Sequence, residues 1–237
     1  MRKFFMASLA STLLLTSVVA QDEKRSTVEG NGNMVTKDIA VSSFEILKAS
    51  GIYELRLSQG DKESVKIEAD ENLHQYFNVK NEGNSLVIDM DKLKKVNLKT
   101  KSKMKVYITF KKLKEMELKT VGNVASDENL SFENLSFKNR SVGNVDIDLT
   151  VNKLELSNTS VGNITLDGKA QDVNVINTGV GTLHAGNFVV QTMNIENSGV
   201  GNAEVNAQKN LKVKDSFLGK VKNKGAAPVR KMNKVRV

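Results

Sequence analysis

A short triplet, Val-Gly-Asn, recurs at nearly equal intervals through the second half of this 237-residue chain. Two variants, Val-Gly-Thr and Leu-Gly-Lys, continue the series, and successive glycines lie 18 to 21 residues apart. The glycines are Gly122, Gly143, Gly162, Gly181, Gly201 and Gly219. A fixed period of this length is typical of architectures built from stacked units. The chain is therefore expected to fold as a stack in which each repeat supplies one similar layer.

Apolar residues keep the same places relative to the glycine in almost every repeat. They stand one position before it, two positions after it, and six and eight positions before it. The row six positions before the glycine is Met116, Phe137, Leu156, Val175, Ile195 and Val213. A spacing of two residues places side chains on one face of a strand. Each repeat is therefore predicted to contain short strands with one buried face.

Asparagine marks another recurring position, four residues before the glycine. The row is Asn139, Asn158, Asn177 and Asn197, with Asp215 in the last repeat. Asn and Asp favour tight turns, and stacked Asn side chains can hydrogen-bond to one another in a ladder. The glycine is expected to form a corner with positive φ, where a side chain would clash.

These features predict an all-β fold, a right-handed parallel β-helix or β-solenoid with coils of about 20 residues stacked ~4.8 Å apart. A β-sandwich also produces many short strands, but it does not require the same residues to recur in phase. Residues 38–119 alternate in polarity without this strict register. They are expected to form either irregular leading coils or a small β-layer that caps the rod, with one helical turn at 70–75.

The first residues have the pattern of a secretory signal peptide. Arg2 and Lys3 precede a short apolar stretch that ends in small residues at Ala20. The polar stretch that follows contains Gly-Asn-Gly-Asn and predicts a flexible leader. No later apolar run is long enough to span a membrane. The expected organisation is a signal peptide over 1–20, a leader over 21–37, a β-rich part over 38–119, solenoid repeats over 120–225 and a basic tail or end cap over 226–237.

The β-rich part also resembles a known family. The segment from Phe44 to Asp61 (FEILKASGIYELRLSQGD), then VKIEADENL from Val65 and GNSLVI from Gly83, precede the repeats in this order. With the Val-Gly-Asn series, they are similar to the head GIN domain family of putative auto-transporter adhesins, over residues 41–225. The resemblance implies a β-helical fold and a place in the bacterial envelope or at its surface. It implies no catalytic or ligand residues.

Residues suited to catalysis or metal binding are scarce. The chain has no cysteine, and its two histidines, His74 and His184, lie in unrelated contexts. Asp146 and Asp148 share one strand face, as do Glu115 and Glu117, and such pairs can bind calcium or act as acid and base. Because we expect no further acid in phase with them in neighbouring repeats, the sequence predicts no catalytic, metal or cofactor site.

Basic residues are concentrated near the C-terminus. Residues 209–237 contain ten Lys or Arg and one acid. Lys212, Lys214, Lys220 and Lys222 form a candidate surface for an anionic ligand, such as envelope or host glycans or anionic surface polymers. Alternatively, these lysines protect an open strand edge from association. Nucleic acid is not expected, because the basic runs lack interleaved aromatic residues.

The combined prediction is an exported, non-enzymatic adhesin-like or binding domain of the bacterial cell envelope. The periplasm, the outer-membrane surface and the extracellular medium are all open as its location. One alternative is a carbohydrate-active enzyme, a polysaccharide lyase or hydrolase built on a β-helix. Another is a purely structural envelope protein. A cleft with three or more convergent carboxylates would favour the enzyme.

Overall fold

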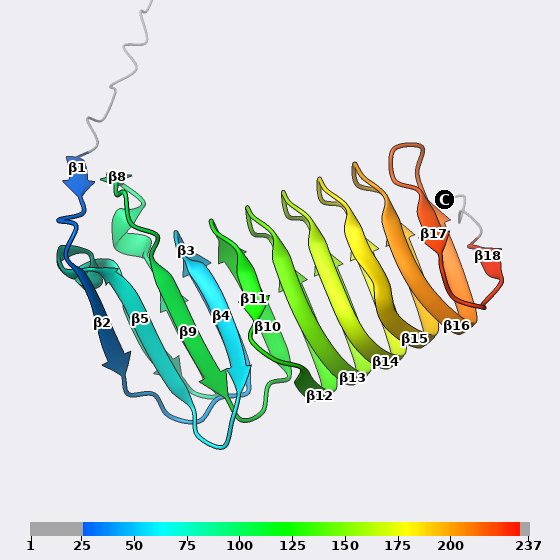
Figure 1. The fold of residues 1–237 in the computed structure, drawn as a ribbon, viewed down its shortest axis with the longest axis horizontal. Coiled ribbons are helices and arrows are strands. Elements are labelled where there is room, and N and C mark those ends of the chain that lie inside the picture. The colour runs from blue at the N-terminus through cyan, green and yellow to red at the C-terminus, as the bar shows by residue number, and fades with distance from the viewer. Residues whose placement is uncertain (1–25, 233–237) are drawn as a thin grey trace, which may run out of the picture.

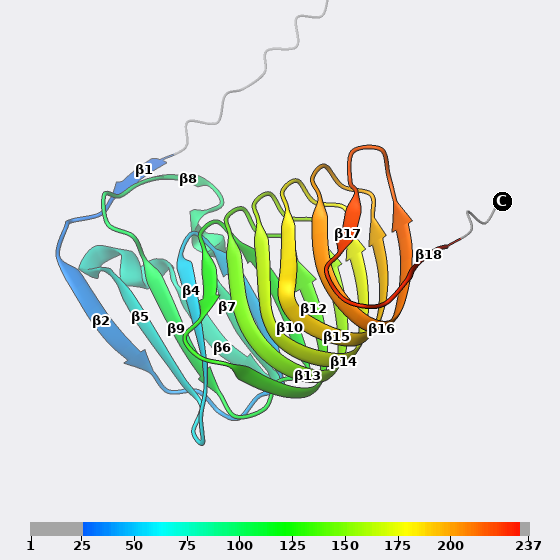
Figure 2. The same ribbon diagram turned by 45° about the vertical axis from the view of Figure 1, so that its right-hand side comes forward.

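The computed structural model describes residues 26–232, which form a rod of stacked β-coils (Figure 1). The predicted signal peptide over 1–20 lies outside the described residues. Figure 2 shows that the coils curve into two arms joined at the bottom of the rod, while narrow corners join successive coils at the top. The long strands are β12 (Leu130–Asn139), β13 (Val145–Asn158), β14 (Ile164–Asn177), β15 (Leu183–Asn197) and β16 (Ala203–Asp215).

We call the half of each coil that follows the corner its first arm and the half that precedes the next corner its second arm. Adjacent coils pair in parallel along both arms, so that residues one repeat apart become neighbours. Leu156, for example, pairs with Val175, which pairs with Ile195. The predicted β-solenoid is therefore confirmed, together with the register of its repeats.

The core of the rod contains three of the four apolar rows found in the sequence. The apolar residues six and eight positions before the glycine, and those two positions after it, point inward and are buried except at Val221, which is partly exposed. The row directly before the glycine differs. Its valines are bridged from coil to coil but lie on the outside, with 50–52% of their surface exposed. All the buried rows stand at even distances from the glycine, whereas this row stands at an odd distance, so the ordinary alternation of faces places it outside.

The corner glycines are required because the backbones of neighbouring coils touch there. Gly162 has φ +135°, and a Cβ on it would lie 2.2 Å from the carbonyl oxygen of Gly143. Its N–H donates to the carbonyl oxygen of Val180 in the next coil. The predicted positive-φ corner is confirmed at five of the six glycines, and Gly219 in the last repeat is the exception.

The predicted asparagine ladder lies just before the corners. The Asn139 amide donates to the side-chain oxygen of Asn158 at 3.0 Å, and further bonds of 2.7 and 2.6 Å continue to Asn177 and Asn197. All four side chains are buried. The ladder ends at Asn197, whose amide donates to the carbonyl oxygen of Gly201. Asp215 pairs instead with Lys231, at 2.7 Å.

The N-terminal part is also made of coils, but they stack in an order that differs from the chain order. The coil formed by β3 (Ile46–Gly51) and β4 (Glu54–Gln59) lies in the middle. On one side it pairs with β7 (Ser85–Asp89) and β9 (Lys105–Phe110). On the other side it pairs with β10 (Glu115–Thr120) and β11 (Val124–Ser126), which lead into the regular coils. The two arms thus continue through this part without a break, as Figure 1 shows.

Antiparallel strands end both arms at the N-terminal end of the rod. On the first arm, β5 (Ser64–Asp70) pairs with β9 and then with β2 (Met34–Ile39), whereas on the second arm β6 (Asn78–Glu82) pairs with β7. Two short 3₁₀ helices, Glu71–Tyr76 and Asp91–Leu93, join these strands. The first of them agrees with the helical turn expected at 70–75.

The predicted flexible leader is wrong for its described residues. β1 (Ser26–Glu29) pairs in parallel with β8 (Val96–Lys99), and β2 begins at Met34. Between them, the Asn72 side chain accepts a bond from the N–H of Asn31 and donates to the carbonyl oxygen of Glu29. Backbone pairing and side-chain hydrogen bonds order this polar segment, and neither leaves an apolar pattern in the sequence.

The C-terminal end of the rod is formed by two short strands on different arms. β17 (Val221–Asn223) pairs with the first arm of β16, and β18 (Val229–Lys231) pairs with its second arm. The region expected to be a basic tail or end cap thus contributes a strand over residues 229–231.

We predict that Gly162→Ala destabilises the protein by more than about 3 kcal/mol, because positive φ alone costs 1–3 kcal/mol and the new methyl group meets the Gly143 backbone. The control is Gly83→Ala, since Gly83 also has positive φ but has open space around it. Urea unfolding of both variants measures the difference. Equal losses would show that the corner contact is not the constraint.

We predict that Asn177→Ala costs about 1–3 kcal/mol, because it leaves buried amide groups of Asn158 and Asn197 without a partner. Asn202→Ala is the control, since Asn202 is exposed and lies outside the ladder. Thermal and urea unfolding should rank the Asn177 variant clearly below the control. A loss of the same small size in both would contradict a stabilising ladder.

Candidate functional site

The four lysines of the candidate anionic surface lie on two different arms of the last coil. Lys212 and Lys214 belong to the second arm of β16, in register with Asn194 and Glu196. Lys222 belongs to β17 on the first arm, and Lys220 is the residue directly before β17. All four are exposed, while Leu211 and Val213 point inward as expected. The structure therefore divides the four residues into two pairs.

Acidic neighbours bind several basic side chains of this end. Ion pairs join Lys214 to Glu196 at 2.6 Å, Lys224 to Glu204 at 2.6 Å and Lys231 to Asp215 at 2.7 Å. The Lys224 ammonium lowers the pKa of Glu204, and that of Lys231 lowers the pKa of Asp215. Among the described residues, no ion pair engages Lys212, Lys220 or Lys222 within 4.0 Å. These three lysines contribute the free positive charge of the candidate surface.

An exposed apolar loop lies beside the lysines and was missed in the sequence. It joins β16 to β17, and its Phe217 and Leu218 are 89% and 60% exposed. Earlier corners have a small buried residue two positions before the glycine: Thr120, Ser141, Ser160, Gly179 and Gly199. Phe217 takes this position in the last repeat and points outward, because the stack has no room for its ring. An alignment of the repeats shows this change from a small residue to Phe.

The acidic residues of the first arm approach one another more closely than expected. Asp148 pairs in register with Asp167 of the next coil, which corrects the expectation that no in-phase acid follows it. Asp148 accepts a hydrogen bond of 2.6 Å from Asn129. Within residues 26–232, no group of three or more His, Asp or Glu side chains is placed to hold a metal ion.

Neither histidine belongs to such a group. His74 lies in the first 3₁₀ helix, where its ring nitrogen bonds to the carbonyl oxygen of Val35 at 2.9 Å and thereby attaches β2. His184 lies on the first arm, in register with Thr165 and Glu204.

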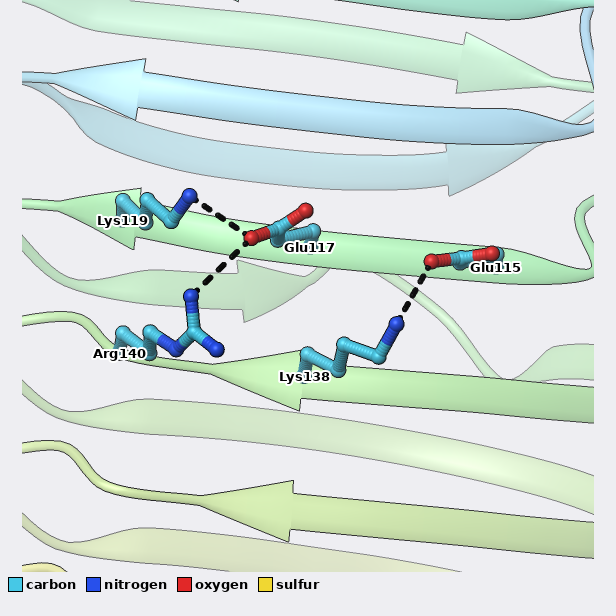
Figure 3. A network of polar contacts seen from close by, with 5 residues as sticks. All are labelled: Glu115, Glu117, Lys119, Lys138 and Arg140. Atoms are coloured by element: carbon cyan, nitrogen blue, oxygen red, sulfur yellow. Dashed lines mark hydrogen bonds and ion pairs between the residues drawn. The ribbon is translucent and has the colours of Figure 1, made fainter.

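The outer face of the second arm has a network of charged side chains near its N-terminal end. Figure 3 shows Glu117 between two cations, with Lys119 Nζ at 2.8 Å and Arg140 Nη1 at 3.5 Å from the same oxygen. Glu115 pairs separately with Lys138 at 3.1 Å. Hydrogen bonding to Lys119, together with the charge of Arg140, lowers the pKa of Glu117. Of the carboxylate pair noted in the sequence, Glu115 is thus bound by one cation and Glu117 by two.

A groove of about 960 Å³ crosses the bottom of the rod where segment 111–114 meets the first long coils. Its lining combines lysines with three carboxylates, those of Glu45, Glu133 and Glu155. Lys114 pairs with Glu45 at 2.7 Å, and Lys153 pairs with Glu155 at 3.0 Å. Two of the three acids are therefore neutralised by neighbours, which is not the arrangement of a glycosidase acid and base.

Fold and surfaces together define a capped β-solenoid domain that presents long exposed faces. The family model of "Putative auto-transporter adhesin, head GIN domain" matches residues 43–227. The chain belongs to this family, as its opening segment and repeats had indicated. No curated protein matches the sequence.

Solved structures of similar fold come from Bacteroides fragilis and Parabacteroides distasonis. A putative adhesin from Bacteroides fragilis shares 28% identity with a TM-score of 0.72, covering 86% of this chain and all of that one. A putative adhesin from Parabacteroides distasonis shares 24% identity (TM-score 0.63; 87% of this chain, 95% of that one). A putative lipid binding protein from the same species shares 18% identity (TM-score 0.62; 87% and 100%). At these levels of sequence identity, the last two structures show similarity of fold alone.

The described part of the chain contains no helix of the length and apolar character needed to cross a membrane.

The Glu117 network predicts a pH-dependent contribution to stability. Because the folded-state pKa of Glu117 lies below the unfolded value of about 4.3, its ion pairs stabilise the protein at neutral pH. This contribution is lost as the pH falls from about 4.3 through the folded-state pKa. Glu117→Gln should cost at most about 1 kcal/mol at pH 7 and nothing once the carboxyl group is protonated.

Urea unfolding of the parent and the variant across a pH series measures this difference. Glu133→Gln is the matched control, since Glu133 is exposed and forms no ion pair within the described residues. A Glu117 effect that stayed constant down to low pH would mean that packing, and not charge, is responsible.

Proposed function

We propose that the protein is an exported, non-enzymatic, adhesin-like domain of the bacterial cell envelope that binds anionic surface polymers, such as acidic glycans, through its last coil. Membership of the adhesin family and the likeness to the Bacteroides fragilis adhesin support the binding role. The N-terminal pattern of Arg2, Lys3 and an apolar stretch supports export.

The observation that carries this proposal is the free positive charge of the last coil. Lys212 on the second arm and Lys220 and Lys222 on the first arm are exposed. The acidic residues near them already form ion pairs with other lysines, because Glu196 pairs with Lys214 and Glu204 pairs with Lys224. Unpaired cations at one end of a rod create a local positive potential that attracts polyanions.

The division of these lysines between two arms indicates the kind of ligand. A small anion can contact one arm only. A polymer that wraps around the end of the rod can contact both arms, and the attractions of its successive charges to the lysines then add. A linear polyanion therefore fits this surface better than a single sugar acid or phosphate.

A non-enzymatic role agrees with the chemistry of the faces. The carboxylates that line the groove at the bottom of the rod are largely engaged by lysines, and Asp148 is bonded to Asn129. Such groups are not poised to exchange protons with a substrate.

The test measures retention on immobilised heparin, used as an anionic polysaccharide probe, with neutral dextran as the reference. Replacing Lys212, Lys214, Lys220 and Lys222 with Gln should abolish retention, and retention of the parent should fall steeply with salt. The matched control replaces Lys37, Lys48, Lys62 and Lys101, which are exposed and distant from the last coil. It removes the same net charge and should retain most of the binding.

Two results would overturn the proposal. Equal loss in both variants would mean that heparin responds to net charge alone. Aggregation of the C-terminal variant, with heparin retention unchanged, would mean that these lysines protect the open edges of β17 and β18.

A further inference from the structure

An apolar ridge follows the corners along the top of the regular coils. It consists of the residue directly before each corner glycine, together with Phe217 at its end. Each of the row residues is 50–60% exposed, and Phe217 is 89% exposed. The members of this corner ridge are Val121, Val142, Val161, Val180, Val200, Phe217 and Leu218.

The ridge is continuous, because successive valines are bridged in parallel from coil to coil. At ~4.8 Å per coil, the row from Val121 to Leu218 extends for about 24 Å. Packing does not account for its composition, since these side chains point away from the core and Thr would fit the same backbone. A contiguous exposed apolar surface of this kind marks an interaction site more often than a chance arrangement.

The rows on either side of the corner ridge contain cations but no acid. One row lies two residues before it: Lys119, Arg140, Thr159, Thr178, Ser198 and Ser216. The other lies two residues after it: Asn123, Asn144, Asn163, Thr182, Asn202 and Lys220. The nearest acids on the second arm, Glu117 and Glu196, stand one row further out and pair with cations. The surface closest to the ridge is therefore apolar, hydroxyl- or amide-bearing, and positive.

Its shape limits what can cover it. The ridge is convex and one residue wide, because it follows the outer edge of the corners (Figure 2). A second copy of the same ridge would touch it along a line only and would bring its own cations close. A fluid surface can instead close around a convex ridge and contact its flanks as well.

We propose that the corner ridge seats the protein on an anionic lipid bilayer, with the rod lying parallel to the membrane plane. Valine, leucine and phenylalanine side chains enter the boundary between headgroups and acyl chains, as in other interfacial elements. Lys119, Arg140 and Lys220 then meet lipid phosphates, and the Thr, Ser and Asn rows can hydrogen-bond to headgroups. Phe217 and Leu218 insert most deeply, because the loop between β16 and β17 is broader than the corners before it (Figure 1). This inference does not rest on polymer binding.

Phe217→Trp gives a direct test, because the chain contains no other tryptophan. The variant is mixed with vesicles of phosphatidylcholine alone or with phosphatidylglycerol added. We expect its emission to shift to the blue with the anionic vesicles, and brominated acyl chains to quench it. We also expect the parent to co-sediment with the anionic vesicles and to remain bound in salt that releases heparin.

A second variant, Val161→Thr with Val180→Thr, removes apolar character from the ridge at nearly constant shape. Its partitioning into the anionic vesicles should fall at least about tenfold, which corresponds to 1.4 kcal/mol. The matched control is Ile176→Thr with Val189→Thr, which changes two exposed apolar residues away from the corners and should leave partitioning unchanged. Unfolding by urea verifies that both variants fold.

The proposal is overturned if the parent does not co-sediment, if the two double variants partition equally, or if neutral vesicles bind as well as anionic ones. It is also overturned if light scattering shows a dimer that Val161→Thr with Val180→Thr converts to a monomer, since the ridge then binds a second copy. Heparin retention separates this question from the proposed function. The ridge variant should keep heparin retention, and the four-lysine variant should lose it.

Discussion

Backbone contact at the corners is the constraint on which the rest of the rod depends. There the N–H of each corner glycine from Gly122 to Gly201 donates to a carbonyl group of the next coil. A Cβ on those from Gly143 to Gly201 would lie only 2.2–2.4 Å from the oxygen of the preceding corner glycine. This approach brings each coil to strand-pairing distance along both arms. The same distance lets the amides of Asn139, Asn158 and their successors bond directly, and it brings the inner apolar rows into contact. Corner, ladder and core are thus consequences of one spacing.

The sequence predicts the regular coils well because chain order and stacking order coincide there. Leu156, Val175 and Ile195 are one period apart in the chain and adjacent in the rod. In the N-terminal part this correspondence fails, since the coil of β3 and β4 lies between coils that come later. Neighbours in space then share no period, and no pattern in the chain reveals the order. The segment around Asn31 fails for another reason, because hydrogen bonds to Asn72 order it without apolar burial.

For the candidate surfaces, alternation predicts which side chains point outward, as it does for Lys212 and Lys214. It does not predict on which arm a residue lies, because that depends on where a long strand bends. The apolar row directly before the glycines shows a different limit, because alternation counted from the buried rows places it outward although its residues are apolar. Two features were within reach of the repeat alignment: Asp167 stands one period after Asp148, and Phe217 occupies a position held elsewhere by small residues.

The unusual position of the coil formed by β3 and β4 determines how such a rod can be assembled. This coil is flanked on one side by β7 and β9 and on the other by β10 and β11, so both its surfaces stay open until all four later strands have formed. Closing these non-local pairings is the slow kind of step in folding. Every regular coil afterwards needs only the coil before it and can be added by templating. The number of repeats can therefore change in evolution without altering the strand pairings of the N-terminal part.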